Sequence, residues 1–225
     1  MSDGVLGPGR RTRVRRLASK ASYDRRRIFD ILDEAHMCHV AAVVDGRALV
    51  LPTLHAREGD MLYLHGSPSN ALLKAVVTSG EACVSVTLYD GLRLARSGFE
   101  SSIAYRSVVL YGGATLVEDH DEKRRVLDMF VNAILPGRTE EVRAMTDQEV
   151  RLTMVVRVRI DEASAKISEG PTEDSAQDMA LPIWSGTVPA ALRFDSPVPS
   201  RDGAMATEDI VVPASVERLV HDREG

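Results

Sequence analysis

Residues 38–54 read CHVAAVVDGRALVLPTL, two apolar runs separated by Asp45-Gly46. An Asp-Gly pair between two such runs is a strong signal for a two-residue turn, so we expect a β-hairpin here. Pro52 lies inside the second run and has no N–H for a ladder hydrogen bond. This strand should therefore lie at a sheet edge or at a bulge.

Further short strands are expected beyond the hairpin. Their predicted ranges are 61–65, 82–89, 92–97, 105–117 and 153–160, with turns at 58–60 and 90–91 and a bulge or bend at Gly112-Gly113. Apolar residues at helical spacing predict helices near 23–36, with Ser22 as its N-cap, near 70–78 and near 120–135. Six or seven short strands joined by hairpins indicate a mainly β fold with flanking helices, arranged as a small antiparallel barrel.

The composition restricts the class of protein. The 225 residues suffice for one large domain or for one domain with an appendage. No apolar run approaches the roughly 18–20 residues of a membrane-spanning helix, so we expect no membrane partner. The N-terminal region lacks the apolar stretch of a secretory signal, and Cys38 and Cys83 sit in strand-like runs typical of buried thiols. Both features favour a reducing, cytoplasmic location.

Charge is distributed unevenly along the chain. Residues 1–27 carry a net charge of +7, whereas residues 161–225 carry −8. No aromatic residue is interleaved with the N-terminal arginines, and the rest of the chain is acidic. We therefore expect the basic arm to meet an acidic surface of its own or of a partner chain and to bind no nucleic acid.

Composition also suggests the domain boundaries. We expect an arm at 1–20, a barrel domain at 21–168 and a Pro-rich, acidic extension at 169–225. The extension would pack on the barrel or on a second subunit through Ile183-Trp184.

A possible phosphate site follows one predicted strand. The segment Leu62-Tyr63-Leu64-His65-Gly66-Ser67-Pro68-Ser69-Asn70 ends in a hydroxyl-rich loop that opens a helix, and Lys74 lies one turn later. Free backbone N–H groups at a helix N-terminus suit a phosphate, and Lys74 would supply a cation. A Ser/Asn helix cap beside a surface lysine accounts for the same residues.

Two other segments carry charged or metal-binding side chains. Arg106, at the start of an apolar strand, would pair with an anion at a barrel mouth, or it is an ordinary exposed strand-end arginine. His36-Met37-Cys38-His39 places metal donors across a helix-to-strand junction, but only the unpatterned His55 or His120 would complete a ligand set. We therefore expect no metal site. No Gly-x-Ser-x-Gly elbow indicates a hydrolase.

Several motifs follow one another along residues 20–160. They are Leu49-Val50-Leu51-Pro52-Thr53, Leu62-Tyr63-Leu64-His65-Gly66-Ser67, Asp90-Gly91-Leu92-x-Leu94-Ala95-Arg96-Ser97, Tyr105-Arg106-Ser107-Val108-Val109-x-x-Gly112 and Glu122-Lys123. Their order and spacing resemble the pyridoxamine 5′-phosphate oxidase-related, flavin-nucleotide-binding proteins, close to the nitroimidazole-resistance proteins. Trp184-x-Gly186-x-x-Pro189 extends the resemblance more weakly into the tail.

The resemblance implies an FMN-binding split β-barrel, antiparallel and Greek-key-like, that forms a homodimer and holds FMN between subunits. It implies three groups of cofactor-binding residues: Val50, Leu51, Pro52 and Thr53 along the isoalloxazine ring, His65, Gly66, Ser67, Asn70 and Lys74 around the ribityl-phosphate, and Arg106 and Ser107 on the next strand. The implied function is an FMN-dependent oxidoreductase acting on a small-molecule substrate. A flavin- or haem-binding module without turnover, or a deazaflavin-dependent reductase, would use the same fold.

One segment departs from the family pattern. Relatives commonly carry His-His-Ser-x-Asn before the Tyr-Arg-Ser motif, and this chain has Glu100-Ser101-Ser102-Ile103-Ala104. A carboxylate in place of an imidazole changes the charge beside the cleft, so we assign no catalytic residue. The residue set that grips the phosphate of pyridoxamine phosphate is not recognisable either, so vitamin B6 oxidation is not expected.

Overall fold

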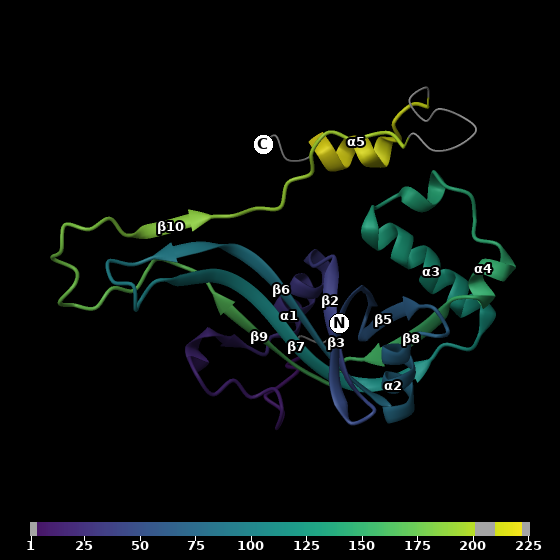
Figure 1. The fold of residues 1–225 in the computed structure, drawn as a ribbon, viewed down its shortest axis with the longest axis horizontal. Helices are drawn as coiled ribbons and strands as arrows, with labels where there is room; N and C mark the ends of the chain where they lie inside the picture. The colour runs from purple at the N-terminus through teal and green to yellow at the C-terminus, as the bar shows by residue number, and fades with distance from the viewer. Residues whose placement is uncertain (1–3, 201–209, 222–225) are drawn as a thin grey trace.

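The computed structural model describes residues 4–200 and 210–221. Within them the strands are β1 (Ala21–Ser22), β2 (Met37–Val44), β3 (Arg47–Leu54), β4 (Ala56–Glu58), β5 (Met61–Gly66), β6 (Glu81–Leu94), β7 (Ser102–Leu116), β8 (Met154–Arg159), β9 (Glu162–Ser168) and β10 (Gly186–Pro189). The α-helices are α1 (Arg25–Glu34), α2 (Ala71–Ser79), α3 (His120–Ile134), α4 (Asp147–Arg151) and α5 (Ala214–His221), and short 3₁₀ turns lie at Ala18–Lys20 and Arg138–Glu140. The expected mainly β fold with flanking helices is confirmed (Figure 1).

The strands form an antiparallel sheet that branches at β7, which pairs with β6, β8 and β9. The sheet order is β3-β2-β6-β7-β8-β5-β4, and β9 pairs with β7 and β1. Along one edge β7 pairs with β9 from Tyr105 to Tyr111, and with β8 from Ala114 to Leu116. The strand therefore changes partner between these two stretches, which turns the sheet toward β5 and β4.

Gly112 lies at this change of partner. A Cβ on Gly112 would stand 1.5 Å from the carbonyl oxygen of Arg159, so only glycine allows the two backbones to approach so closely. Of the predicted bulge or bend at Gly112-Gly113, the bulge is absent, because the pairing of β6 with β7 runs in register through both residues, and the turn of the sheet lies at the change of partner from β9 to β8. The glycine serves close packing instead.

The predicted β2–β3 hairpin is confirmed. Asp45 and Gly46 both have positive φ, 49° and 72°, as a two-residue hairpin turn requires. β3 lies at one end of the strand order, so Pro52 sits on an edge strand as predicted.

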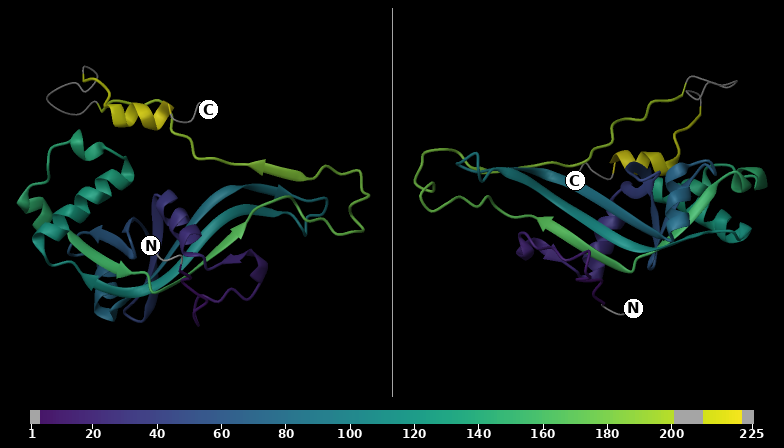
Figure 2. Two further views of the ribbon diagram at one scale, coloured as in Figure 1. Left: turned by 180° about the vertical axis from the view of Figure 1, so that it is seen from behind. Right: turned by 60° about the horizontal axis from the view of Figure 1, so that its bottom comes forward.

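Asp90-Gly91 does not make the predicted turn between two strands. β6 runs on from Glu81 to Leu94, and its register against β7 shifts between Tyr89 and Gly91. The pair forms a bulge within a long hairpin arm of β6 and β7, which projects away from α3 in both views of Figure 2. Gly91 also admits β10, since a Cβ there would meet the carbonyl oxygen of Val188 at 2.2 Å.

The helices begin at capping residues. α1 starts at Arg25 rather than at 23, because the carboxylate of Asp24 accepts from the N–H of Arg27; Ser22 is not its cap. Asn70 caps α2 in the same way through the N–H of Leu73, and Asp119 caps α3 through that of Glu122.

The core has two parts. One fills the barrel and is closed by the buried faces of α1 and α2. Cys38 lies inside it, and burial raises the pKa of its thiol to about 12, so the group stays protonated. The other part lies between β5, β8 and the helices α3 and α4, with Tyr63, Phe130 and Val155 at its centre.

The basic arm lies on the acidic edge of the barrel. Arg11 donates to Glu81 and Glu162 at 2.6 and 2.8 Å, and its guanidinium lies 4.3 Å from the centroid of the Tyr111 ring. The expectation that the arm meets an acidic surface of its own chain is met at Arg11.

The C-terminal extension contains structure that the sequence did not predict, namely β10, which pairs with β6, and α5. Its first part is held at the hairpin arm, where Asp174 accepts from the backbone N–H and the guanidinium of Arg96 at 2.6 and 2.5 Å. Ile183 and Trp184 are 48% and 66% exposed, so they do not anchor the extension on the barrel of this chain. No helix in the described part of the chain is long and apolar enough to cross a membrane.

Candidate functional site

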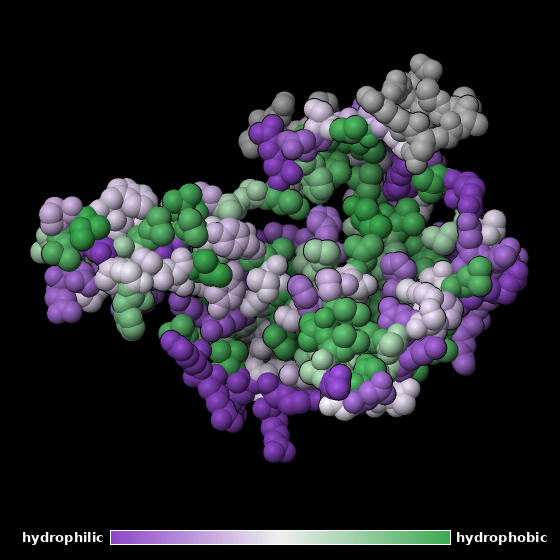
Figure 3. Space-filling view, viewed as in Figure 1, coloured by the Kyte–Doolittle hydropathy of each residue, from purple (hydrophilic) through white to green (hydrophobic). Residues whose placement is uncertain are grey.

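The edge strand β3 presents an apolar wall to solvent. Val50 and Leu51 are 56% and 40% exposed, Pro52 is exposed and Thr53 is half-buried. Figure 3 shows apolar side chains gathered in the middle of one face, between the hairpin arm and helices α3 and α4. An exposed apolar wall with free backbone groups along an edge strand suits a planar ring that needs an apolar surface and a few hydrogen bonds.

The predicted phosphate loop joins β5 to α2. The Ser67 and Ser69 hydroxyls lie 2.8 Å apart, and Ser67 also accepts from the N–H of Ser69. The Asn70 side chain is used as the N-cap of α2. Lys74 is exposed on the first turns of the same helix, and no ion pair of its ammonium is found within residues 4–200 and 210–221. The loop, the helix N-terminus and an uncommitted cation therefore lie together, as predicted.

Gly66 and His65 end β5 below this loop. A Cβ on Gly66 would meet Leu73 at 3.0 Å and Asn70 at 3.3 Å, so the strand approaches α2 closely there. The His65 ring packs against Phe130, with ring centroids 4.2 Å apart, and its Nδ1 is buried without a partner in the described residues. Burial lowers the pKa of His65, which keeps the ring neutral.

Arg106 and Ser107 lie on β7, and their hydrogen-bond partners are not residues of the Ser67–Asn70 loop. The Arg106 guanidinium donates to Glu34 at the end of α1 and to both carboxylate oxygens of Asp90. The hydrogen bonds to these two carboxylates raise the pKa of Arg106 above its usual range, and the bond to Glu34 has the larger effect. Because two carboxylates already compensate this arginine, it offers little net charge to a further anion. Ser107 donates to the carbonyl oxygen of Lys166 at 3.4 Å.

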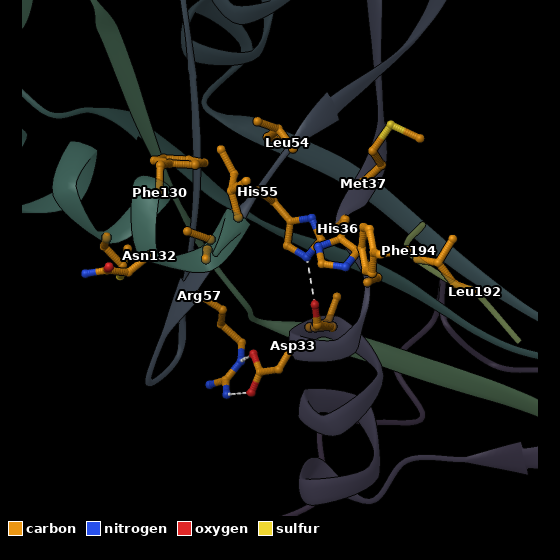
Figure 4. Close-up of a pocket in the computed structure, with 16 residues that line it drawn as sticks. Asp33, His36, Met37, Leu54, His55, Arg57, Phe130, Asn132, Leu192 and Phe194 are labelled. Carbon is orange, nitrogen blue, oxygen red and sulfur yellow. Dashed lines mark hydrogen bonds and ion pairs between the residues drawn. The ribbon is translucent and has the colours of Figure 1, made fainter. Parts of the chain in front are cut away.

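A cavity of about 620 Å³ lies between the end of α1, the β3–β4 junction and α3 (Figure 4). Its walls are mostly apolar, and the C-terminal extension contributes Leu192 and Phe194. The remaining lining residues are Leu32, Asp33, Ala35, His36, Met37, Leu54, His55, Ala56, Arg57, Met129, Phe130, Asn132, Ala133 and Ile134. This volume lies within the range of about 300–1,000 Å³ that is typical of cavities for cofactor-sized ligands.

Two histidines from different elements meet at this cavity. His55 is 5% exposed, and its Nε2 lies 2.8 Å from the carbonyl oxygen of Leu32, to which it donates in the neutral ring. Burial lowers the pKa of His55, and the nearby His36 lowers it further, whereas the Leu32 carbonyl and Asp33 act in the opposite direction. The His55 Nδ1 is buried without a partner in the described chain. His36, at the start of β2, is exposed and stands edge-on to Phe194, with ring centroids 6.1 Å apart.

Most other polar groups around the cavity are already committed. Arg57 binds Asp33 with both donor groups of its fork, Nε–Oδ1 being 2.7 Å, and also donates to the carbonyl oxygen of Gly59. The Asn132 carbonyl oxygen accepts from the backbone and hydroxyl of Thr139. Of the two histidines that line the cavity, His55 donates a hydrogen bond, whereas none is found for the ring nitrogens of His36 in the described residues.

The sequence did not point to this cavity. It offered His36 and His55 only as metal donors that lacked a complete set, and no group of three metal-binding side chains is assembled in the described residues. Phe130, Leu192 and Phe194 are ordinary apolar residues, and no local pattern marks them as a wall around a ligand. His36 and His55 were the only residues of this cavity that the sequence singled out. Their proximity could not be predicted, because they become neighbours only through the pairing of β2 with β3.

Comparison with known proteins places the chain. The family model of pyridoxamine 5′-phosphate oxidase matches residues 24–167. The chain belongs to this family. A comparison with curated proteins finds no match.

Two solved structures resemble the chain over nearly its whole length, and a third resembles 65% of it. The flavocytochrome Anf3 from Azotobacter vinelandii is 35% identical with a TM-score of 0.86, covering 94% of this chain and 97% of its own. An FAD- and haem-binding protein from Mycobacterium smegmatis is 37% identical with a TM-score of 0.83, covering 89% and 97%. A protein from Bacteroides thetaiotaomicron, provisionally assigned as a 5-nitroimidazole antibiotic resistance protein, is 26% identical with a TM-score of 0.56. The match covers 65% of this chain and 86% of that protein. The split-barrel fold and the predicted family are confirmed.

Proposed function

We propose that this chain is a redox protein that binds a flavin nucleotide on the barrel and a haem beside it. The observation that carries the proposal is the agreement over 94% and 89% of the chain with a flavocytochrome and with an FAD- and haem-binding protein. That agreement includes the C-terminal extension, which the family model does not reach. The extension helps to line the cavity at Leu192 and Phe194.

The flavin would lie along β3 and β5. In this proposal the free edge of β3 at Val50–Thr53 lies along the isoalloxazine ring, and the Ser67 loop, the N-terminus of α2 and Lys74 hold the phosphate next to the ribityl chain. The exposed apolar surface of β3 and the uncommitted ammonium of Lys74 support this placement. Arg106 would not contact the flavin phosphate directly, because its guanidinium is already paired with Glu34 and Asp90.

We infer FAD rather than the FMN that the sequence resemblance implied. The support comes from the Mycobacterium smegmatis protein, which is an FAD- and haem-binding protein at 37% identity. Both nucleotides carry a phosphate at the end of the ribityl chain, so the same loop and lysine would serve either one. FMN is the alternative, and identification of the cofactor released from the protein distinguishes the two.

The proposed activity is electron or hydride transfer to a small molecule. The flavin supplies the redox chemistry when it is bound. The chain's own residues would bind and orient it: β3 would offer backbone groups to the ring, and Gly66, which has no side chain, lets the end of β5 pack closely against the start of α2 beside the proposed phosphate loop.

Purified protein tests the proposal. We expect a yellow-red preparation with flavin bands and a Soret band, and mass spectrometry of the released cofactors should give FAD and a haem. Turnover is tested by adding a nicotinamide donor anaerobically and following flavin bleaching. A colourless protein that takes up neither flavin nor haem on reconstitution would refute the proposal, and FMN alone would restrict it to the FMN oxidoreductase expected from the sequence.

A further inference from the structure

We propose that the cavity between α1, β4 and α3 is the haem site of this chain, and that His36 is the side chain that ligates the iron. The inference rests on the proposed function for the presence of haem, and on this structure for the place and the ligand.

The first step concerns the donor. Haem iron is held by imidazole more often than by other protein ligands, and the liganding nitrogen must carry a free lone pair. His36 is exposed at the cavity wall, and its ring nitrogens make no hydrogen bond with the residues that the structure describes. The His55 Nε2 is engaged by the Leu32 carbonyl and its Nδ1 is buried, so iron reaches neither atom without movement of the ring.

The second step concerns the wall. A porphyrin presents two broad apolar faces, and its strongest polar requirement inside a pocket is the axial ligand. The lining of this cavity is mostly aliphatic and aromatic, and its other polar side chains, Arg57, Asp33 and Asn132, are bound to one another or to neighbouring residues. An isoalloxazine ring has polar atoms along its edge, which these walls would leave without partners. The lining therefore favours haem over flavin.

The third step concerns position. The strand residues proposed to face the flavin, Val50–Thr53, continue directly into Leu54 and His55, which line the cavity. His65, at the other side of the proposed flavin site, packs on Phe130, another lining residue. The two proposed sites thus share a wall, an arrangement that suits electron exchange between two cofactors.

His55 has a positioning role in this scheme. Its hydrogen bond to Leu32 ties the end of α1 to the β3–β4 junction, and its ring lies beside that of His36 (Figure 4). It keeps the α1–β2 corner in place and so orients His36 without touching the iron.

The experiment compares haem-reconstituted wild type with four variants by absorption, EPR and haem titration. His36→Ala should lose the imidazole-ligated Soret and EPR signature and bind haem at least tenfold more weakly, with unchanged flavin content. Added imidazole should restore the signature in His36→Gly, which shows that the pocket is folded. His55→Gln should keep the ligation signature, and the matched control His39→Ala, which lies on β2 three residues after His36 and outside the lining, should behave as wild type.

The outcomes separate the ligand assignment from the proposed function. Wild-type haem ligation that survives in His36→Ala overturns the assignment, as does a signature lost in His55→Gln but kept in His36→Ala. A wild type that binds flavin and takes up no haem overturns both the haem site and the haem part of the proposed function, and leaves the flavin part standing. Flavin loss in His36→Ala also contradicts the proposal, since it would place the flavin in this cavity.

Discussion

Lys74 is the side chain best placed to recognise a phosphate, because it is exposed on α2 directly after the hydroxyl-rich loop. Lys74→Ala should weaken FMN binding by the apo-protein about tenfold to a hundredfold, since a charge-assisted phosphate contact is worth roughly 1.5–3 kcal/mol. Riboflavin has no phosphate, so its weaker binding should hardly change. Fluorescence-quenching titrations measure both affinities.

Lys123→Ala on α3 is the matched control for this titration, and neither flavin should bind it differently from wild type. Equal affinity of the wild type for FMN and riboflavin would contradict the phosphate site, and would leave the loop as a helix cap with a surface lysine.

His65 makes the stability of the apo-protein depend on pH. Burial lowers its pKa in the folded chain, so below its unfolded value of about 6.5 the unfolded chain takes up a proton that the folded chain does not. The free energy of unfolding should therefore fall as the pH decreases below about 6.5, and His65→Gln should show a shallower fall. Urea unfolding at a series of pH values measures this slope; the same slope in both proteins would be evidence against the neutral buried ring.

Individual residues differ in how far the sequence revealed them. Pro52 on an edge strand and Asn70 at a helix start were predictable, because proline chemistry and capping act locally. The partners of Arg106 were not, since Glu34 lies 72 positions away in the chain and reaches it only when α1 packs on β7. The cavity was hidden for the same reason.

Among the elements, β7 depends on one glycine. Gly112→Ala would place a Cβ at 1.5 Å from the backbone of Arg159 and should lower the free energy of unfolding by more than about 3 kcal/mol, because the clash involves backbone rather than a movable side chain. In Gly113→Ala, the neighbouring control, the nearest atom is an Asp161 carboxylate oxygen at an ordinary 3.7 Å, and the change should stay within about 1 kcal/mol. Denaturant unfolding of both variants decides the point, and similar losses would refute it.

Elements with a local signal were predicted well, and those without one were not. The β2–β3 hairpin and α3 follow from an Asp-Gly turn and a helical apolar period. The bulge at Asp90-Gly91 has the same turn signature as a hairpin, and only the pairing with β7 distinguishes the two. β9 and β10 were not predicted, because each gains its stability from distant strands rather than from its own sequence.

At the scale of the whole molecule, we propose that the protein is a homodimer. The edge strand β3 and the exposed apolar side chains Val43, Val50 and Leu51 form a surface that a second copy would cover. Ile183 and Trp184 of the extension are also exposed and would reach the partner. Sedimentation at micromolar concentration should give twice the mass of the chain; a flavin-loaded monomer would contradict this.

Double substitution of Val50 and Leu51 by Ser separates the dimer from the fold. The pair lies on the exposed wall, so the barrel should keep its thermal transition while the dimer dissociates at least tenfold more readily. An unchanged dimer would move the interface elsewhere on the molecule.

The central claim is that a flavin lies against β3 with its phosphate at the start of α2. A crystal structure of the flavin-loaded protein tests it most directly. We expect isoalloxazine density along Val50–Thr53 and phosphate density within hydrogen-bonding distance of Ser67 and Lys74. Flavin density inside the cavity lined by His36 and His55, with the β3 wall bare, would contradict it.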